Sequence, residues 1–313
     1  MQYGAVMIVC VGESLVDVVY KDGIVSETVG GGPFNVALTT ARLGVSTALF
    51  TKVSKDSYGN MILEKLIDNC IMFDPQLCNV DLPTLCSKAN IDQDGKAEYV
   101  FDWKQTAASN ATVAQLSNAF SVMTDIDFIM TGSLMLAFPS TRDVVFPAID
   151  TVHPRPVVFY DPNVRPAVIE DMSEFKTKMF QFAQQSEIVK ISEDDLNLVF
   201  PNMSLDKAIE NLKKTCKLYL IVTRGEKGAS WYAPNFEISV PACKPETLVD
   251  TIGCGDVFSG ALLAQLQKRK DRCKKGIEDL SETEAKKMLE FASKLAADNC
   301  TKHGCDPSCR SFS

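Results

Sequence analysis

The sequence lacks the features that would direct it to a membrane, a nucleic acid or the cell exterior. It has no apolar run of about 18 residues, the length a membrane-spanning helix requires, and its first apolar stretch follows no positively charged region. The net charge is −8, and the lysines and arginines form no stripe along the chain. We therefore expect a cytoplasmic protein that binds neither nucleic acid nor membrane.

Cysteine is abundant, but its arrangement does not suggest a secreted disulfide framework. The 11 cysteines are odd in number and irregularly spaced, which is typical of free thiols in a reducing compartment. The densest group is Cys300, His303, Cys305 and Cys309, and it lacks the cysteine pairs, two residues apart, that zinc sites commonly use. These thiols are expected to behave as small hydrophobic side chains.

The chain also has no Walker-type phosphate loop, internal repeat or low-complexity linker. From Phe128 onward it alternates short apolar runs, near 128–131, 157–161, 188–191 and 219–223, with helical segments. This alternation predicts a single α/β domain over residues 1–313, with a parallel sheet between two layers of helices. Polar residues just after these strands are candidate site residues, because ligands of such folds bind at the carboxyl ends of the strands.

Two stretches, at about 15–30 and 86–106, differ from this pattern. Each carries mixed polarity on both faces around a turn, at Lys21–Gly23 and at Asp92–Gly95, and each is predicted to be a hairpin. Together they could form a small separate sheet that acts as a lid. Its exposed edges could pair with a second copy of the chain and give a homodimer.

A glycine-rich turn precedes each of two predicted helices. Gly253 and Gly255 come just before an apolar helix, whose free N–H groups would attract an anion, and Asp256 places a carboxylate beside them. That carboxylate could accept the proton of an attacking hydroxyl or could simply cap the helix. The other turn, Gly30–Pro33, is followed by Asn35, whose amide could bind sugar hydroxyls.

Asp17 is expected where the first buried strand ends, a place to hold substrate hydroxyls, although a simple turn acid explains it as well.

These segments resemble the ribokinase-like (PfkB) family of carbohydrate kinases along nearly the whole chain. Residues 31–37 and 250–256 look like the two family signatures, and residues 161–165 (Asp-Pro-Asn-Val-Arg) are similar to a stretch common in fructokinases and 2-keto-3-deoxygluconate kinases. Residues 222–228 look like a nucleotide-binding segment of the family, and residues 299–308 like its closing loop. The implied fold is three-layered, α-β-α, with a small β-sheet lid.

The resemblance implies a role for each matching residue. The catalytic group would be Asp256 as the base, with the backbone N–H groups of Gly253, Cys254 and Gly255. The sugar would be bound by Asp17, Gly31, Gly32, Asn35, Lys104, Asn163 and Arg165. ATP would be bound by Lys190, Thr223, Gly225, Gly228, Gly255 and Asn299. A monovalent cation such as K⁺ would be bound by Asp250, Ile252, Asn299, Gly304 and Ser308.

The implied activity is transfer of the γ-phosphate of ATP, with Mg²⁺, to a terminal hydroxyl of a small sugar, with fructose the first expectation. The alternatives are a 2-keto-3-deoxygluconate kinase, a ribokinase and, from a different class, an inactive sugar- or nucleotide-binding protein.

Three departures from the family pattern bear on the site. Cys254 stands where the family usually has alanine, at a helix N-terminus, where the pKa of a thiol is expected to fall. Lys104 stands where fructokinases often have arginine, and residues 192–195 match the Mg²⁺-linked segment only loosely.

Overall fold

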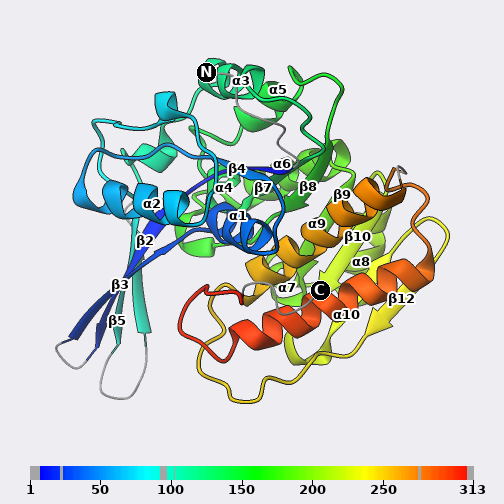
Figure 1. The fold of residues 1–313 in the computed structure, drawn as a ribbon. Coiled ribbons are helices and arrows are strands. Elements are labelled where there is room, and N and C mark those ends of the chain that lie inside the picture. Colours follow the sequence, from blue (N-terminus) through cyan, green and yellow to red (C-terminus); the bar gives the residue numbers. More distant parts are fainter. Residues whose placement is uncertain (1–7, 22–23, 92–96, 102, 274–275, 309–313) are drawn as a thin grey trace.

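The structure of the protein is a computed structural model that describes residues 8–21, 24–91, 97–101, 103–273 and 276–308 (Figure 1). It contains an eight-stranded sheet covered by helices and a separate four-stranded sheet. The large sheet has the order β12-β11-β10-β9-β8-β7-β1-β4. Its strands are β1 (Ile8–Val11), β4 (Thr47–Phe50), β7 (Phe128–Gly132), β8 (Val157–Asp161), β9 (Ile188–Ser192), β10 (Tyr219–Thr223), β11 (Ala229–Tyr232) and β12 (Glu237–Val240).

Neighbouring strands pair in parallel along the stretch β10-β9-β8-β7-β1-β4 of this order. At the other edge, β11 and β12 are added in antiparallel pairing. The predicted parallel sheet is therefore confirmed, with an antiparallel extension. The carboxyl ends of the parallel strands meet along one edge, where Asp161 ends β8 and Thr223 ends β10.

Helices cover both faces of this sheet. Side chains alternate along β1: Ile8 and Cys10 belong to one buried cluster, Val9 and Val11 to the other. The first cluster packs under α1 (Gly32–Arg42), α2 (Ser57–Asp68), α9 (Cys254–Cys273) and α10 (Glu282–Asn299). The second packs under α3 (Val113–Ser121), α4 (Ser133–Ala137), α5 (Val145–Ile149), α6 (Met172–Gln185), α7 (Glu193–Val199) and α8 (Leu205–Lys213).

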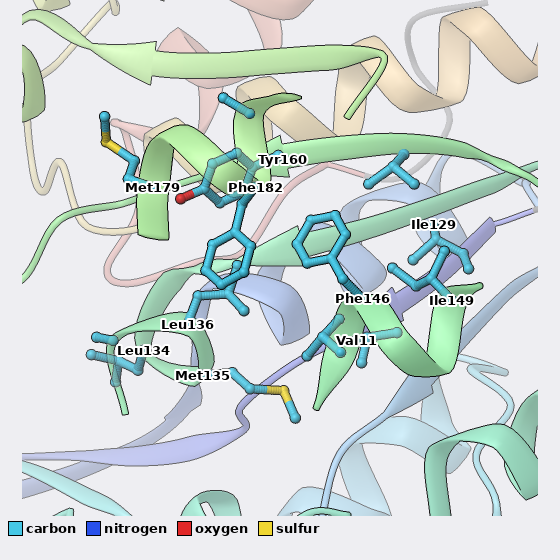
Figure 2. Close-up of a cluster of buried hydrophobic side chains, with 14 of the residues drawn as sticks. Val11, Ile129, Leu134, Met135, Leu136, Phe146, Ile149, Tyr160, Met179 and Phe182 are labelled. Carbon is cyan, nitrogen blue, oxygen red and sulfur yellow. The ribbon is translucent and has the colours of Figure 1, made fainter. Parts of the chain in front are cut away.

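The second cluster holds β7 and β8 in place. Figure 2 shows Phe146 of α5 and Phe182 of α6, whose rings stack with centroids 4.9 Å apart, beside Tyr160 of β8. Tyr160 meets Phe182 edge-on at 6.1 Å and is fully buried. Because Asp161 follows Tyr160 directly, this packing fixes the end of β8 and with it the position of the Asp161 side chain.

The small sheet has the order β3-β2-β5-β6 and extends away from the body of the molecule (Figure 1). Its strands are β2 (Leu15–Lys21), β3 (Ile24–Gly30), β5 (Cys86–Ile91) and β6 (Ala97–Phe101). Both predicted hairpins are present and join through parallel pairing of β2 with β5. Residues 22–23 of the turn expected at Lys21–Gly23, the turn expected at Asp92–Gly95 and the thiol of Cys309 lie outside the described residues.

The location expected for Asp17 is wrong. The first parallel strand ends at Val11, and Asp17 lies within β2 of the small sheet, opposite Thr28 of β3 and Ser87 of β5. The chain leaves the large sheet at Gly12, which packs so closely on Pro33 that a Cβ there would lie 2.3 Å from the proline ring. Asp17 is therefore carried by the small sheet.

Within the part of the chain that the structure describes, no helix is both long enough and apolar enough to cross a membrane.

Candidate active site

The two glycine-rich turns meet where α1 crosses α9. Asn35 on α1 and Asp256 in the first turn of α9 are 221 residues apart in sequence, and Asn35 Nδ2 donates a hydrogen bond of 2.8 Å to Asp256 Oδ2. The helices approach closely at Gly260, where a Cβ would lie 2.6 Å from Thr39 Cβ. The predicted amide and the predicted base are therefore direct partners.

The environment of Asp256 suits a base that works near neutral pH. Its side chain is almost completely buried, and this burial raises the pKa of the carboxyl from 3.8 to about 6. The Asn35 hydrogen bond opposes the rise, the negative charge of Asp161 adds to it, and the charges of Lys190 and Arg165 oppose it. Asp256 is consequently ionised at pH 7 yet remains basic enough to accept a hydroxyl proton.

A buried ion pair lies beside this carboxylate. Lys190 Nζ is 2.9 Å from Asp161 Oδ2, and Ser259 of α9 donates to the same oxygen at 3.1 Å. Burial favours a neutral Lys190, but the carboxylates of Asp161, Asp195 and Asp256 outweigh it and raise the pKa of the ammonium. A Cβ at Gly255 would lie 3.4 Å from Lys190 Nζ, so a fixed positive charge stands against the glycine turn.

Gly253 adopts a left-handed conformation, with φ 73°, immediately before α9 begins at Cys254. A Cβ on Gly253 would lie 2.7 Å from Cys305 Cβ, so glycine is required by packing as well as by backbone angle. The helix start leaves N–H groups in its first turn without helical partners, which is the arrangement that binds anions.

The other glycine turn lies among strand ends. Gly31 has φ 111°, and a Cβ there would lie 2.7 Å from Glu13 O. A Cβ on Gly32 would lie 3.0 Å from Ser133 Oγ and 3.4 Å from Asn163 Nδ2. The backbone of this turn thus lies directly against the ends of β7 and β8.

Asp17 and Arg165 belong to the same surroundings. Burial raises the pKa of the Asp17 carboxyl, while a hydrogen bond with Ser87 and the charge of Arg165 lower it. The arginine influences both Asp17 and Asp256, and so lies within electrostatic reach of both. Two buried acceptors here, Asn35 Oδ1 and Asp161 Oδ1, have no hydrogen-bond partner among the described residues, so this site can accept hydrogen bonds from a ligand.

The structure does not join Lys104 to this group. Its ammonium is exposed, lies 2.8 Å from the Glu170 carboxylate and stands over the Trp103 ring.

Glu13 is a site residue that the sequence interpretation missed. It is 1% exposed, and its two carboxylate oxygens accept hydrogen bonds from Gly32 N at 3.1 Å and Met135 N at 3.3 Å. Burial raises the pKa of Glu13 to about 7, against the lowering effect of its hydrogen bonds, first that of Ser133. The signal was available, because Glu13 lies two residues after the end of the buried strand β1, at the edge where Asp161 ends β8.

Of the predicted nucleotide residues, Lys190 lies within β9, and Thr223, Gly225 and Gly228 lie at and after the end of β10. Thr223 ends β10, and the next turn holds Gly225, with φ 52° and open space around a Cβ, and Gly228, with φ 96° and a Cβ position 2.0 Å from Val240 O. Lys227 in this turn forms an ion pair with Glu193, the first residue of α7, directly after β9.

The segment matched loosely to Mg²⁺ binding, residues 192–195, has a structural use. Asp195 Oδ2 accepts hydrogen bonds from Ser192 in a capping box at the start of α7, and its Oδ1 accepts one from Val164 N at 2.9 Å. Among the carboxylates of this segment, that of Asp195 therefore holds the backbone next to Asn163 in place.

Four of the five predicted cation ligands converge around Asn299. Asn299 Nδ2 donates to Ile252 O at 3.2 Å and to Gly304 O at 3.1 Å, and Asp250 Oδ2 accepts from Gly304 N at 2.9 Å. These oxygens are of the hard type that alkali cations prefer. Ser308 instead donates to Asp298 and accepts from Lys302.

The buried side chain of Asn299 thus holds the closing segment together, and its Oδ1 also accepts from Asp306 N.

The expectation that the Cys254 pKa falls is wrong. Burial, and after it a hydrogen bond with Cys300, whose Sγ lies 3.0 Å away, raise the pKa of this thiol to about 12. The helix N-terminus favours a thiolate, but here desolvation is the larger effect.

A sequence model described as the pfkB family carbohydrate kinase matches residues 1–311. The chain is 31% identical to a fructokinase of Rhizobium leguminosarum bv. trifolii, over 88% of this chain and 84% of that protein. It is 30% identical to fructokinase-1 of rice, Oryza sativa subsp. japonica, over 96% and 94% of the two chains. A crystal structure of fructokinase with bound ATP from Xylella fastidiosa superposes with a TM-score of 0.82 at 20% identity, covering 96% of this chain and 93% of that one.

Proposed function

Since the chain belongs to the pfkB family of carbohydrate kinases, we propose that it transfers the γ-phosphoryl group of ATP to a terminal hydroxyl of fructose. The observation that carries this proposal is the buried Asp256, with a pKa of about 6, at the N-terminus of α9 and bonded to Asn35. A helix cap alone does not require such burial. Similarity to fructokinases over most of the chain supports fructose as the acceptor.

In this proposal Asp256 accepts the proton of the sugar hydroxyl as that oxygen attacks phosphorus. Asn35 Nδ2 orients the carboxylate, and the unpartnered Asn35 Oδ1 accepts a hydrogen bond from another sugar hydroxyl. Asp17, Gly31, Gly32, Asn163 and Arg165 complete the sugar site.

The phosphoryl group lies over the glycine turn. In this proposal the N–H groups of Gly253, Cys254 and Gly255 face its developing charge, and Cys254 N–H exchanges its 3.3 Å hydrogen bond to Thr251 O for one to the phosphoryl group. Lys190 adds a fixed positive charge next to Gly255. Each such donor contributes on the order of 3 kcal/mol to transition-state stabilisation in measured cases.

ATP extends from this turn toward Thr223, Gly225, Gly228 and the Asn299 segment. Mg²⁺, when bound to the triphosphate, would supply charge neutralisation, and Glu193, which pairs with Lys227 of the turn and whose side chain is 21% exposed, is a carboxylate beside this region. The carbonyls of Ile252 and Gly304 with Asp250 would hold K⁺. Higher activity in K⁺ than in Na⁺ at equal ionic strength is the expected result, and equal activity would remove the cation from the proposal.

The small sheet serves as a lid in this proposal. It carries Asp17 into the site, and Gly304 of the closing segment lies against Thr28 of β3, with 3.5 Å from a Cβ position to Thr28 Cγ2. Closure would exclude water, which otherwise competes as phosphoryl acceptor. Exposed apolar residues on the sheet, Tyr20, Ile24, Val25 and Val100, would support pairing with a second copy, testable by sedimentation.

The test is a coupled assay of ADP formation with fructose, ribose, 2-keto-3-deoxygluconate and adenosine. We expect the highest kcat/KM with fructose. Asp256→Asn should lose at least about 10³-fold in kcat while still binding fructose and ATP. Asp68→Asn, the same chemical change at an exposed position of α2, should retain activity. Unchanged turnover in Asp256→Asn would refute the assigned base, and binding without turnover in the wild type would favour the inactive-protein alternative.

A further inference from the structure

Two thiols meet at the glycine turn where phosphate is proposed to bind. Cys254 lies in the first turn of α9 and Cys300 just after the end of α10, and their sulfur atoms are 3.0 Å apart. Both thiols are partly exposed. A third cysteine, Cys305, packs against Gly253.

The backbone holds both cysteines in position. The Cys300 carbonyl accepts hydrogen bonds from Val249 N at 2.8 Å and Asp250 N at 3.2 Å, and Cys300 N donates to Ala296 O at 3.1 Å. Cys254 N donates to Thr251 O at 3.3 Å. The backbone of both residues is therefore held by hydrogen bonds while their sulfurs lie in contact.

We propose that Cys254 and Cys300 form a reversible disulfide when the protein meets a peroxide, and that this bond switches off phosphoryl transfer. The inhibitory part rests on the proposed function. Formation of the bond does not, because it follows from the position of the two thiols alone.

The chemistry balances with hydrogen peroxide as the oxidant. The sulfur of one cysteine attacks one peroxide oxygen, the O–O bond breaks, and a sulfenic acid and one water result. The other sulfur then attacks the sulfenic sulfur, the S–S bond forms, the S–O bond breaks, and a second water leaves. Peroxide takes two electrons, and both thiol protons end in water.

Inhibition follows from the position of Cys254. A disulfide needs an S–S distance of about 2.05 Å, so the sulfurs must approach by about 1 Å from their present contact. That movement acts on the helix turn whose N–H groups are proposed to face the phosphoryl group. A misplacement of about 1 Å at a catalytic position can reduce the rate by about 10²-fold.

The surroundings also determine the speed of oxidation. Cys254 faces Cys300, Cys305 and the Asp250 carboxylate, and burial raises its pKa to about 12. Thiolate is the reactive form, so burial of this thiol makes its oxidation slow at neutral pH. Reagents that carry negative charge are further disfavoured by Asp250.

The experiment treats the full-length protein with hydrogen peroxide and measures three quantities: kinase activity, recovery by dithiothreitol, and cysteine linkage by peptide mass mapping. We expect an activity loss of about tenfold or more that dithiothreitol reverses, together with a linked peptide pair containing Cys254 and Cys300. Bound ATP should slow both changes, because it would occupy the turn.

Cys300→Ala should keep its initial activity and show no loss that dithiothreitol reverses. Cys243→Ala removes an exposed cysteine elsewhere and should respond to peroxide like the wild type. Cys305→Ala should also form the bond. Linkage of Cys254 to Cys305 instead, or complete loss of activity without a Cys254–Cys300 peptide, would overturn the proposal.

Peptide mass mapping of the peroxide-treated wild type tests for the Cys254–Cys300 disulfide even if a variant fails to fold. Disulfide formation in a protein that never phosphorylates a sugar would refute the proposed function and leave the thiol pairing standing.

Discussion

Asp256→Asn should make the protein more stable while removing its activity. The carboxyl has a pKa of 3.8 when unfolded and about 6 in the folded protein, so folding opposes its ionisation. An acid whose pKa is raised by folding loses stability as pH rises between these two values, and the loss is complete above the folded pKa. Asparagine carries no charge and can still accept the Asn35 hydrogen bond with its amide oxygen.

The magnitude follows from the two pKa values. At 1.36 kcal/mol per pKa unit, ionisation of Asp256 lowers the stability of the wild type by about 3 kcal/mol at pH 8 and by about 1 kcal/mol at pH 4.5. The stability advantage of the variant should therefore grow by about 2 kcal/mol over this range. Any constant change in packing cancels in the difference between the two pH values.

The assay is urea unfolding of the wild type, Asp256→Asn and the exposed control Asp68→Asn at pH 4.5 and pH 8, followed by circular dichroism. The advantage of Asp256→Asn should increase with pH, and Asp68→Asn should follow the wild type. Parallel pH dependence of the wild type and Asp256→Asn would show that Asp256 is not strained by burial, and the argument for a tuned base would fail.

Three further results are expected. The kcat/KM for the sugar should fall about tenfold per pH unit below pH 6, as Asp256 becomes protonated, and stay level above it; a coupled assay at fixed ionic strength measures this. Gly260→Ala should lower kcat without unfolding the protein, because a methyl group 2.6 Å from Thr39 Cβ pushes α1 away from α9. A second substitution, Thr39→Gly, should recover activity because it removes that Cβ, whereas Thr39→Ala keeps the Cβ and should not. Glu13→Gln should raise KM for the sugar and leave KM for ATP unchanged, because one of its two backbone donors loses a carboxylate acceptor.

The sequence was sufficient for features that repeat or that are local. Apolar runs alternating with helical segments predicted the parallel sheet, and mixed-polarity hairpins predicted the small sheet. The glycines before two helices located both turns. Each of these predictions depends on neighbouring residues in the chain, where periodicity and turn chemistry operate.

The errors arose where tertiary contacts decide. Asp17 was assigned to the end of the first buried strand although the stretch 15–30 was itself predicted to form a separate hairpin, because the mostly apolar run Leu15–Lys21 looks like a continuation of the buried strand. The Cys254 pKa was predicted from the helix start alone, while its burial comes from segments 45 and 46 residues away. Glu13 was passed over because its partners, Gly32 N and Met135 N, come from two other parts of the chain.

The glycines of the site also show the difference between local sequence features and tertiary contacts. In the sequence, the glycines of the two turns were explained by the approach of a ligand, and Gly260 was not singled out. In the structure Gly31, Gly253 and Gly260 are each required by a protein neighbour, respectively Glu13 O, Cys305 Cβ and Thr39 Cβ, all within 2.7 Å of a Cβ position. Without these close approaches α1 and α9 could not bring Asn35 to within 2.8 Å of Asp256. The glycines therefore assemble the base and its partner first, and an open phosphate-binding turn is a consequence of that assembly.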